Sequence, residues 1–150
     1  MLRTREEIIA ALLVVLTVVI FLALAPQFFS KKSAITLNTF KPSVSAYDQK
    51  PGNKVVVATA IFSYTGYVAI YSEINGEPGA VIGVSELIDH GTNNILVEFS
   101  PSSVIREGDM LYAVLHMDNG DGNYEYPGPD EPIKNDSGNF VMAKFKIVEQ

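Results

Sequence analysis

The distribution of apolar and polar positions divides this chain into two parts. Residues 8–25 form a run of eighteen residues without a charge, in which Thr17 is the sole polar side chain. At a helical rise of about 1.5 Å per residue this run reaches roughly 27 Å, close to the thickness of a bilayer's hydrocarbon core. Phe28 and Phe29 follow as an aromatic interfacial end. The pattern predicts a transmembrane helix inside a membrane anchor of residues 1–29.

After the anchor, the apolar pattern shortens to extended runs separated by turn residues. Residues 30–42 are expected to form a stalk, with a first alternating strand at 34–40. Later runs predict strands at 55–62, 67–71, 81–84, 95–99, 110–117 and 141–147. Asn75-Gly76 and Pro78-Gly79 indicate tight turns, and Ser85 to Gly91 indicate a single helical turn. The spacing predicts a mainly β fold in which residues 43–150 form an antiparallel β-sandwich of the immunoglobulin-like kind.

The N-terminal segment also has features of a cleaved secretory signal. Arg3 and Arg5 precede the apolar run, and Ala23-Leu24-Ala25 gives a small-x-small pattern. The length of the run and the position of Pro26 directly after that pattern favour a retained anchor. Basic residues flank the run on both sides, so the prediction of a cytoplasmic N-terminus and an extracytoplasmic domain rests on the acidity and strand content of the domain.

Charge and cysteine content exclude several classes of function. From residue 33 onward the chain carries 15 acidic and 7 basic residues, a net charge of −8. A domain this acidic is repelled by phosphate backbones, which argues against nucleic-acid binding. Cysteine is absent, which excludes disulfides, thiolate metal sites and a thiol nucleophile.

An ordered series of sequence blocks resembles a known family. The blocks are residues 66–71 (GYVAIY), 79–87 (GAVIGVSEL), 111–116 (LYAVLH), 118–125 (DNGDGNYE) and 127–130 (PGPD), followed by Val141-Met142. Over residues 43–148 the chain resembles an uncharacterised family of extracytoplasmic β domains, which occur in archaeal surface proteins and in small membrane-anchored bacterial proteins. The resemblance implies a location and a fold. It implies no catalytic residues, because the family has no established activity.

The acidic segment from Asp118 to Asp136 is the strongest candidate for a ligand site. Carboxylates alternate there with glycines, as calcium requires when it gathers six to eight oxygens on a curved backbone. A standard EF-hand is excluded because Met117 occupies the first ligand position. Two interpretations remain: a solvated hairpin loop with Asn, Asp and Gly in turn positions, or an irregular calcium site formed by Asp118, Asp121, Glu125 and Asp130.

Other chemistry is weakly indicated. Ser85, Asp89 and His90 lie too close in sequence to form a catalytic relay, and the second glycine of a nucleophile elbow is missing. A blue-copper site would need a cysteine, so His116 at its strand end is expected to be hydrogen-bonded structure. Asn135-Asp136-Ser137 matches a glycosylation sequon in a predicted loop.

The sequence therefore predicts a non-enzymatic membrane-anchored surface module without a catalytic or cofactor-binding residue. It would act as a structural element or as an accessory subunit of a membrane protein assembly, in contact with the bilayer through residues 8–25 and with other membrane or surface proteins or with itself. One alternative is a pilin-like filament subunit with a helical core and an outer β domain. Another is an anchored enzyme or electron-transfer domain based on carboxylate chemistry.

Overall fold

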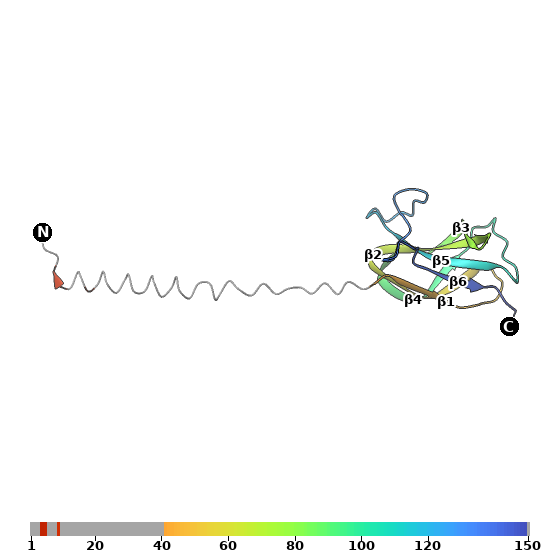
Figure 1. The fold of residues 1–150 in the computed structure, drawn as a ribbon, viewed down its shortest axis with the longest axis horizontal. Helices are drawn as coiled ribbons and strands as arrows, with labels where there is room; N and C mark the ends of the chain where they lie inside the picture. The colour runs from red at the N-terminus through yellow and green to blue at the C-terminus, as the bar shows by residue number, and fades with distance from the viewer. Residues whose placement is uncertain (1–3, 6–8, 10–40, 150) are drawn as a thin grey trace. The chain divides into compact units, whose positions relative to one another are not determined.

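One long strand organises the domain. The structure is a computed structural model that describes residues 4, 5, 9 and 41–149, and residues 41–149 belong to one compact unit. Six strands follow one another along the chain (Figure 1): β1 (Ser43–Ala46), β2 (Lys54–Ile74), β3 (Glu77–Val84), β4 (Ile88–Glu98), β5 (Met110–Met117) and β6 (Met142–Lys146). β2 is 21 residues long. It joins the two strands predicted at 55–62 and 67–71 into one.

The two halves of β2 have different partners. Residues 54–61 pair with β1 and β4, and residues 66–74 pair with β3 and β5. β6 extends the sheet by pairing with β5, and every pairing between named strands is antiparallel. All six strands therefore belong to one curled sheet with the path β1-β2-β5-β6. The prediction of a mainly β, antiparallel domain is confirmed.

Gly66 lies where β2 passes from one half of the sheet to the other. It pairs with Ile88 of β4 and with Met117 of β5. A Cβ at this position would lie 2.3 Å from the backbone oxygen of His116 and 2.6 Å from the ring of Phe62. Since real Cβ atoms do not approach that closely, the close approach of the Gly66 backbone to the His116 backbone and to the Phe62 ring requires a glycine here.

The main core lies between the two halves of the curled sheet. Strand residues point alternately to opposite faces, so each half contributes every second side chain to this core. The larger fully buried members include Phe62, Ile70, Leu111, Leu115 and Phe145. A second, smaller cluster lies on the opposite face of β2 and β5, and its buried members are Ala69, Tyr71, Tyr112 and Val114.

Of three local predictions made from turn and cap residues, the structure confirms one and contradicts two. Asn75 and Gly76 form the β2–β3 hairpin turn with φ of 54° and 88°, as the Asn-Gly pair predicts. Pro78-Gly79 lies inside β3, so the second turn prediction is wrong. The helical turn at Ser85 is also wrong: the Ser85 N–H donates to the Val68 oxygen at 3.0 Å, and β4 begins at Ile88.

The predicted anchor helix at 8–25 and the predicted strand at 34–40 lie outside the described residues, apart from Ile9. Within the part of the chain that the structure describes, no helix has the length and apolarity needed to cross a bilayer.

Candidate functional site

The segment between β5 and Pro132, here called the acidic loop (residues 118–131), covers the outer face of β2 and β5. Both of its ends are attached to strands. The Met117 N–H donates to the Glu131 oxygen at 3.1 Å, and the Asp118 N–H donates to the Thr65 oxygen at 3.2 Å. This arrangement places the loop over Tyr71 and His116.

Two of the predicted calcium ligands shape the beginning of the loop. Asp118 accepts a hydrogen bond from the Gly122 N–H at 3.1 Å and another from the Thr65 hydroxyl at 3.2 Å. Asp121 accepts from the Asn123 N–H at 2.8 Å. Such side-chain to backbone bonds are the turn chemistry that Asp and Asn provide in irregular segments.

Asp130 holds the loop closed. It is fully buried, and each carboxylate oxygen accepts a backbone N–H: Oδ1 from Asn119 at 3.0 Å and Oδ2 from Glu125 at 2.8 Å. Charged acceptors make stronger hydrogen bonds than neutral ones, so this one side chain fastens two distant points of the loop.

The four residues proposed as calcium ligands thus lie in one loop but differ in their exposure to solvent. Asp130 is buried, Asp118 is half-buried, and Asp121 and Glu125 are exposed. Among the described residues, no group of three or more carboxylate or imidazole side chains is placed to hold a metal ion. The calcium site stays a prediction, and a rise in melting temperature at millimolar calcium is the result that would support it.

Tyr67, Tyr71 and His116 are buried beneath the loop. Together with the rings of Tyr124 and Tyr126 from the loop itself they form a cluster, here called the Tyr–His cluster. His116 Nδ1 lies 2.7 Å from the Asp130 backbone oxygen, and Nε2 lies 2.8 Å from the Tyr71 hydroxyl. Because a carbonyl oxygen only accepts, Nδ1 carries the proton and Nε2 accepts from Tyr71. The expectation that His116 is hydrogen-bonded structure is confirmed.

The rings of the cluster pack around this imidazole. The centroid of the His116 ring lies 4.9 Å from that of Tyr126 and 5.4 Å from that of Tyr124, both edge to face. The Tyr71 ring stacks at 5.9 Å. These are favourable aromatic distances, so the loop and the sheet are joined by packing as well as by hydrogen bonds.

Burial fixes the protonation states in the cluster. It lowers the pKa of His116, although the backbone and carboxylate of Asp130 and the carboxylate of Glu131 act in the opposite direction. Burial likewise raises the pKa of Tyr71, and it raises the pKa of Tyr124 to about 12. Near neutral pH His116 is therefore a neutral imidazole, and Tyr71 and Tyr124 are neutral phenols.

The hydroxyl of Tyr67 lies in the same cluster and has no hydrogen-bond partner among the described residues. Its pKa is raised, first by burial and then by the carboxylate of Asp118. The ring packs edge to face on Tyr124 at 5.5 Å.

Sequence reasoning did not bring these rings together. A signal was available, because Tyr67, Ala69 and Tyr71 on β2 share a face by their spacing of two, as do Tyr112, Val114 and His116 on β5. The position of Tyr124 and Tyr126 over this face depends on the path of the acidic loop, which no local pattern specifies.

The three residues considered for catalysis, Ser85, Asp89 and His90, do not share one set of contacts in the structure. The Ser85 hydroxyl accepts from the Val68 N–H at 3.0 Å and donates to the Glu86 oxygen at 2.8 Å. Asp89 and His90 are exposed and contact each other through a carboxylate oxygen and the imidazole Nδ1. Both hydrogen bonds of the Ser85 hydroxyl are thus directed at backbone atoms.

A surface hollow of about 540 Å³ lies beside the end of β2 and the start of β5, and its lining includes Glu73, Ile82, Val104 and Asp109. Both of these carboxylates have structural partners. Glu73 pairs with Lys144 at 3.1 Å, and Asp109 accepts from the Arg106 N–H at 2.7 Å.

Comparison with known proteins identifies a family for most of the β domain. The family described as "Domain of unknown function (DUF7282)" matches residues 42–148. Cell surface glycoprotein 2 of the archaeon Haloarcula hispanica is 36% identical over 92 residues, which cover 60% of this chain and 10% of that protein. The chain thus corresponds to a small part of a much longer relative. No solved structure is significantly similar to this chain.

Proposed function

We propose, on the premise that this chain belongs to the DUF7282 family, that it is a membrane-anchored, non-enzymatic surface module. In this role it serves as a structural element or accessory subunit of a membrane protein assembly. The observation that carries the proposal is the similarity of its β domain to a segment of a cell surface glycoprotein. In this chain an uncharged run at residues 8–25 precedes that domain.

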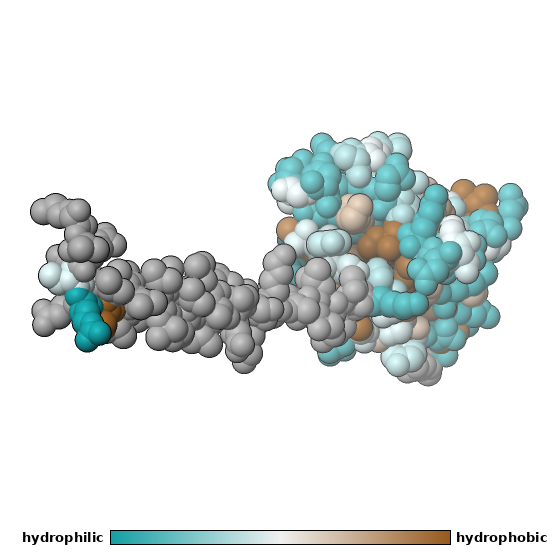
Figure 2. All heavy atoms as spheres, turned by 60° about the vertical axis from the view of Figure 1, so that its left-hand side comes forward, coloured by the Kyte–Doolittle hydropathy of each residue, from teal (hydrophilic) through white to brown (hydrophobic). Residues whose placement is uncertain are grey.

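The composition of the domain surface supports a location in which the domain is surrounded by water. Hydrophilic residues cover most of the face seen in Figure 2, and the apolar residues form small separate patches. Exposed large apolar side chains such as Tyr47, Tyr64 and Val104 come from different segments. The net charge of −8 after residue 32 adds to solubility.

The contacts of the polar residues support a structural role. His116 and Asp130 are buried and hydrogen-bonded within the acidic loop and the Tyr–His cluster. Ser85 bonds to backbone atoms. The proposed unit is then the curled sheet itself, whose two halves pack face to face in the manner of a β-sandwich, with the loop fastened on its outer side.

Anchoring is tested by placing charges in the apolar run. The Leu13→Lys/Val18→Lys double variant should release the chain from membranes into the soluble fraction, because lysine at the centre of a membrane helix costs about 2.5–3.5 kcal/mol. Ser33→Lys, outside the run, is the matched control and should remain in the membrane. If the double variant stays in the membrane fraction as the control does, the apolar run is not the anchor.

The assembly role is tested by gentle extraction of native membranes, followed by sizing and mass spectrometry of co-migrating proteins. Stoichiometric co-migration with other membrane proteins supports an accessory subunit. A polymer that contains this chain alone favours the filament alternative. A lone protomer would exclude both forms of assembly. Protease added to intact cells should cut the domain if it lies outside.

A further inference from the structure

Asn135 directly precedes the turn of a small hairpin between the acidic loop and β6. Lys134 and Phe140 bridge the base of the hairpin, the Asn135 N–H donates to the Asn139 oxygen at 2.8 Å, and Gly138 turns the chain with φ of 81°. Asn135, Asp136 and Ser137 are all exposed. Of the nine asparagines in the sequence, Asn135 alone is followed two residues later by Ser or Thr.

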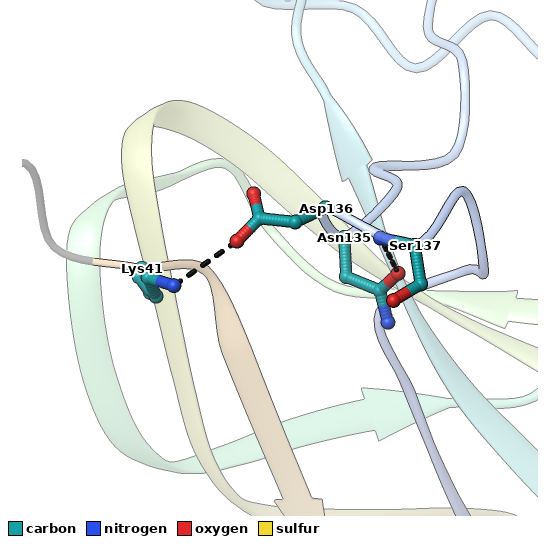
Figure 3. Close-up of polar contacts among 4 residues, drawn as sticks. All are labelled: Lys41, Asn135, Asp136 and Ser137. Carbon is teal, nitrogen blue, oxygen red and sulfur yellow. Dashed lines mark hydrogen bonds and ion pairs between the residues drawn. The ribbon is translucent and has the colours of Figure 1, made fainter.

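The side chain of Asn135 is held in one orientation. Its Oδ1 accepts the Ser137 N–H at 3.0 Å and the Asn139 N–H at 3.1 Å. Two donors on the same atom identify it as the oxygen, because the amide nitrogen cannot accept. Figure 3 shows this oxygen turned toward the backbone nitrogen of Ser137 and the amide nitrogen turned away from it. In the described residues, Nδ2 donates no hydrogen bond.

Charge around the hairpin is partly balanced. Asp136 stands between the asparagine and the serine, and Lys41 forms an ion pair with it at 3.0 Å (Figure 3). The side chains are 87% and 91% exposed, so solvent screens the pair. Lys41 nevertheless places a positive charge beside a position that an anionic reactant would approach.

We propose that Asn135 is an N-glycosylation site, an inference that rests on the proposed extracytoplasmic location of the domain. The donor is an oligosaccharide linked to a lipid phosphate or pyrophosphate, and a membrane transferase catalyses the step. Asn135 Nδ2 forms a bond to the anomeric carbon of the sugar. The bond from that carbon to the phosphate oxygen breaks, the phosphate leaves with the electron pair, and Nδ2 gives up one proton to the transferase.

The structure suggests what the sequon contributes. The Asn135 oxygen is occupied by backbone donors on its own hairpin, and the nitrogen is left exposed for transfer. Ser137 is exposed on the same hairpin, so a transferase has access to the side chains of both residues.

The test is mass spectrometry of the full chain purified from its native host. Cleavage after Lys134 and Lys144 isolates the ten-residue peptide 135–144, which contains the sequon. We expect this peptide to carry one oligosaccharide. The modification should be lost in Asn135→Gln and Ser137→Ala and retained in Ser137→Thr.

The chain offers a matched control with the same turn. Asn119 Oδ1 accepts the Asp121 N–H at 2.9 Å, yet residue 121 is not Ser or Thr. Asn119→Gln should leave the mass of the glycan unchanged, and Asp121→Ser should add a second one. Modification of Asn135 that persists in Ser137→Ala would overturn the role of the sequon.

Failure of this inference differs from failure of the proposed function. An unmodified peptide from a domain that external protease cuts overturns the glycosylation site and leaves the surface module standing. An unmodified peptide from a domain that protease cannot reach on intact cells counts against both.

Discussion

The two faces of the sheet formed by β2 and β5 are stabilised in different ways. The inner face packs aliphatic and Phe side chains into the main core, in which contact is non-directional and excludes water. The outer face is covered by the acidic loop, and its stability depends on directed contacts of Asp130 and His116. The inner face therefore determines whether the domain folds, whereas the outer face determines whether one loop stays in place.

The largest expected effect is at the inner face. Phe62→Ala removes a fully buried ring and should lower the free energy of unfolding by about 3–5 kcal/mol. Chemical denaturation measures it as a lower midpoint with an unchanged slope. Tyr64→Ala is the control, because Tyr64 is 69% exposed and should shift the midpoint little. A Phe62 variant with unchanged stability would contradict the assignment of the main core.

Removal of the Asp130 carboxylate should have a smaller and local effect. Asp130→Ala leaves the N–H groups of Asn119 and Glu125 without their acceptor, and we expect a loss of about 2 kcal/mol. Hydrogen exchange should accelerate in residues 118–131 and stay slow in the strands. Asp121→Ala, which removes one exposed acceptor, is the control. Equal acceleration of hydrogen exchange in the loop and in the strands would show that the loop does not open independently of the sheet.

The outer face should also respond to acid through His116. Above pH of about 6.5 the imidazole is neutral in both the folded and the unfolded chain. Below it, the unfolded chain takes up a proton that the folded protein resists, because burial lowers the pKa of His116. Stability should therefore decline as pH falls from about 6.5 toward the folded pKa. The free energy of unfolding changes by at most about 1.4 kcal/mol per pH unit across this interval.

The check on this pH dependence is denaturation at pH 7 and pH 5 of the original chain and of His116→Gln. The difference between the two pH values should shrink in this variant. His90→Gln removes an exposed imidazole and serves as the control. A decline of the same size in His116→Gln would assign the acid response to other groups.

The smallest expected effect concerns single hydroxyls. Tyr71→Phe removes the donor to His116 Nε2 and should cost about 1 kcal/mol. Tyr67→Phe should cost nothing or stabilise, because the Tyr67 hydroxyl is buried without a partner among the described residues. Thermal unfolding of the two variants side by side compares them directly. A larger loss of stability in Tyr67→Phe than in Tyr71→Phe would contradict the hydrogen bonding described for the cluster.

The strand pattern was predictable because it depends on local alternation. Leu111, Ala113 and Leu115 share one face at a spacing of two, and the structure places all three in the main core. The continuity of β2 was not predictable in this way. Ser63 to Gly66 separate the two predicted strands, and the chain stays in the sheet there through the pairing of Thr65 and Gly66 with β4 and of Gly66 with β5.

The site was less predictable than the fold. The acidic composition of residues 118–131 was visible, but the burial of Asp130 beside exposed Asp121 depends on the path of the loop. The partners of Asp130 are the backbone N–H groups of Asn119 and Glu125, which every residue except proline offers. No side-chain pattern therefore identifies them.

The length of β2 has a consequence during synthesis. β2 is complete at Ile74, whereas its partner β5 begins at Met110. At a translation rate of about 5–20 residues per second, the ribosome needs roughly 2–7 seconds to bridge that interval. Throughout this time the second half of β2 has an unpaired apolar edge, which another nascent chain can join by strand addition. The period before β5 emerges is thus when this domain is most prone to aggregate, and variants that delay β5 should reduce yield before they reduce stability.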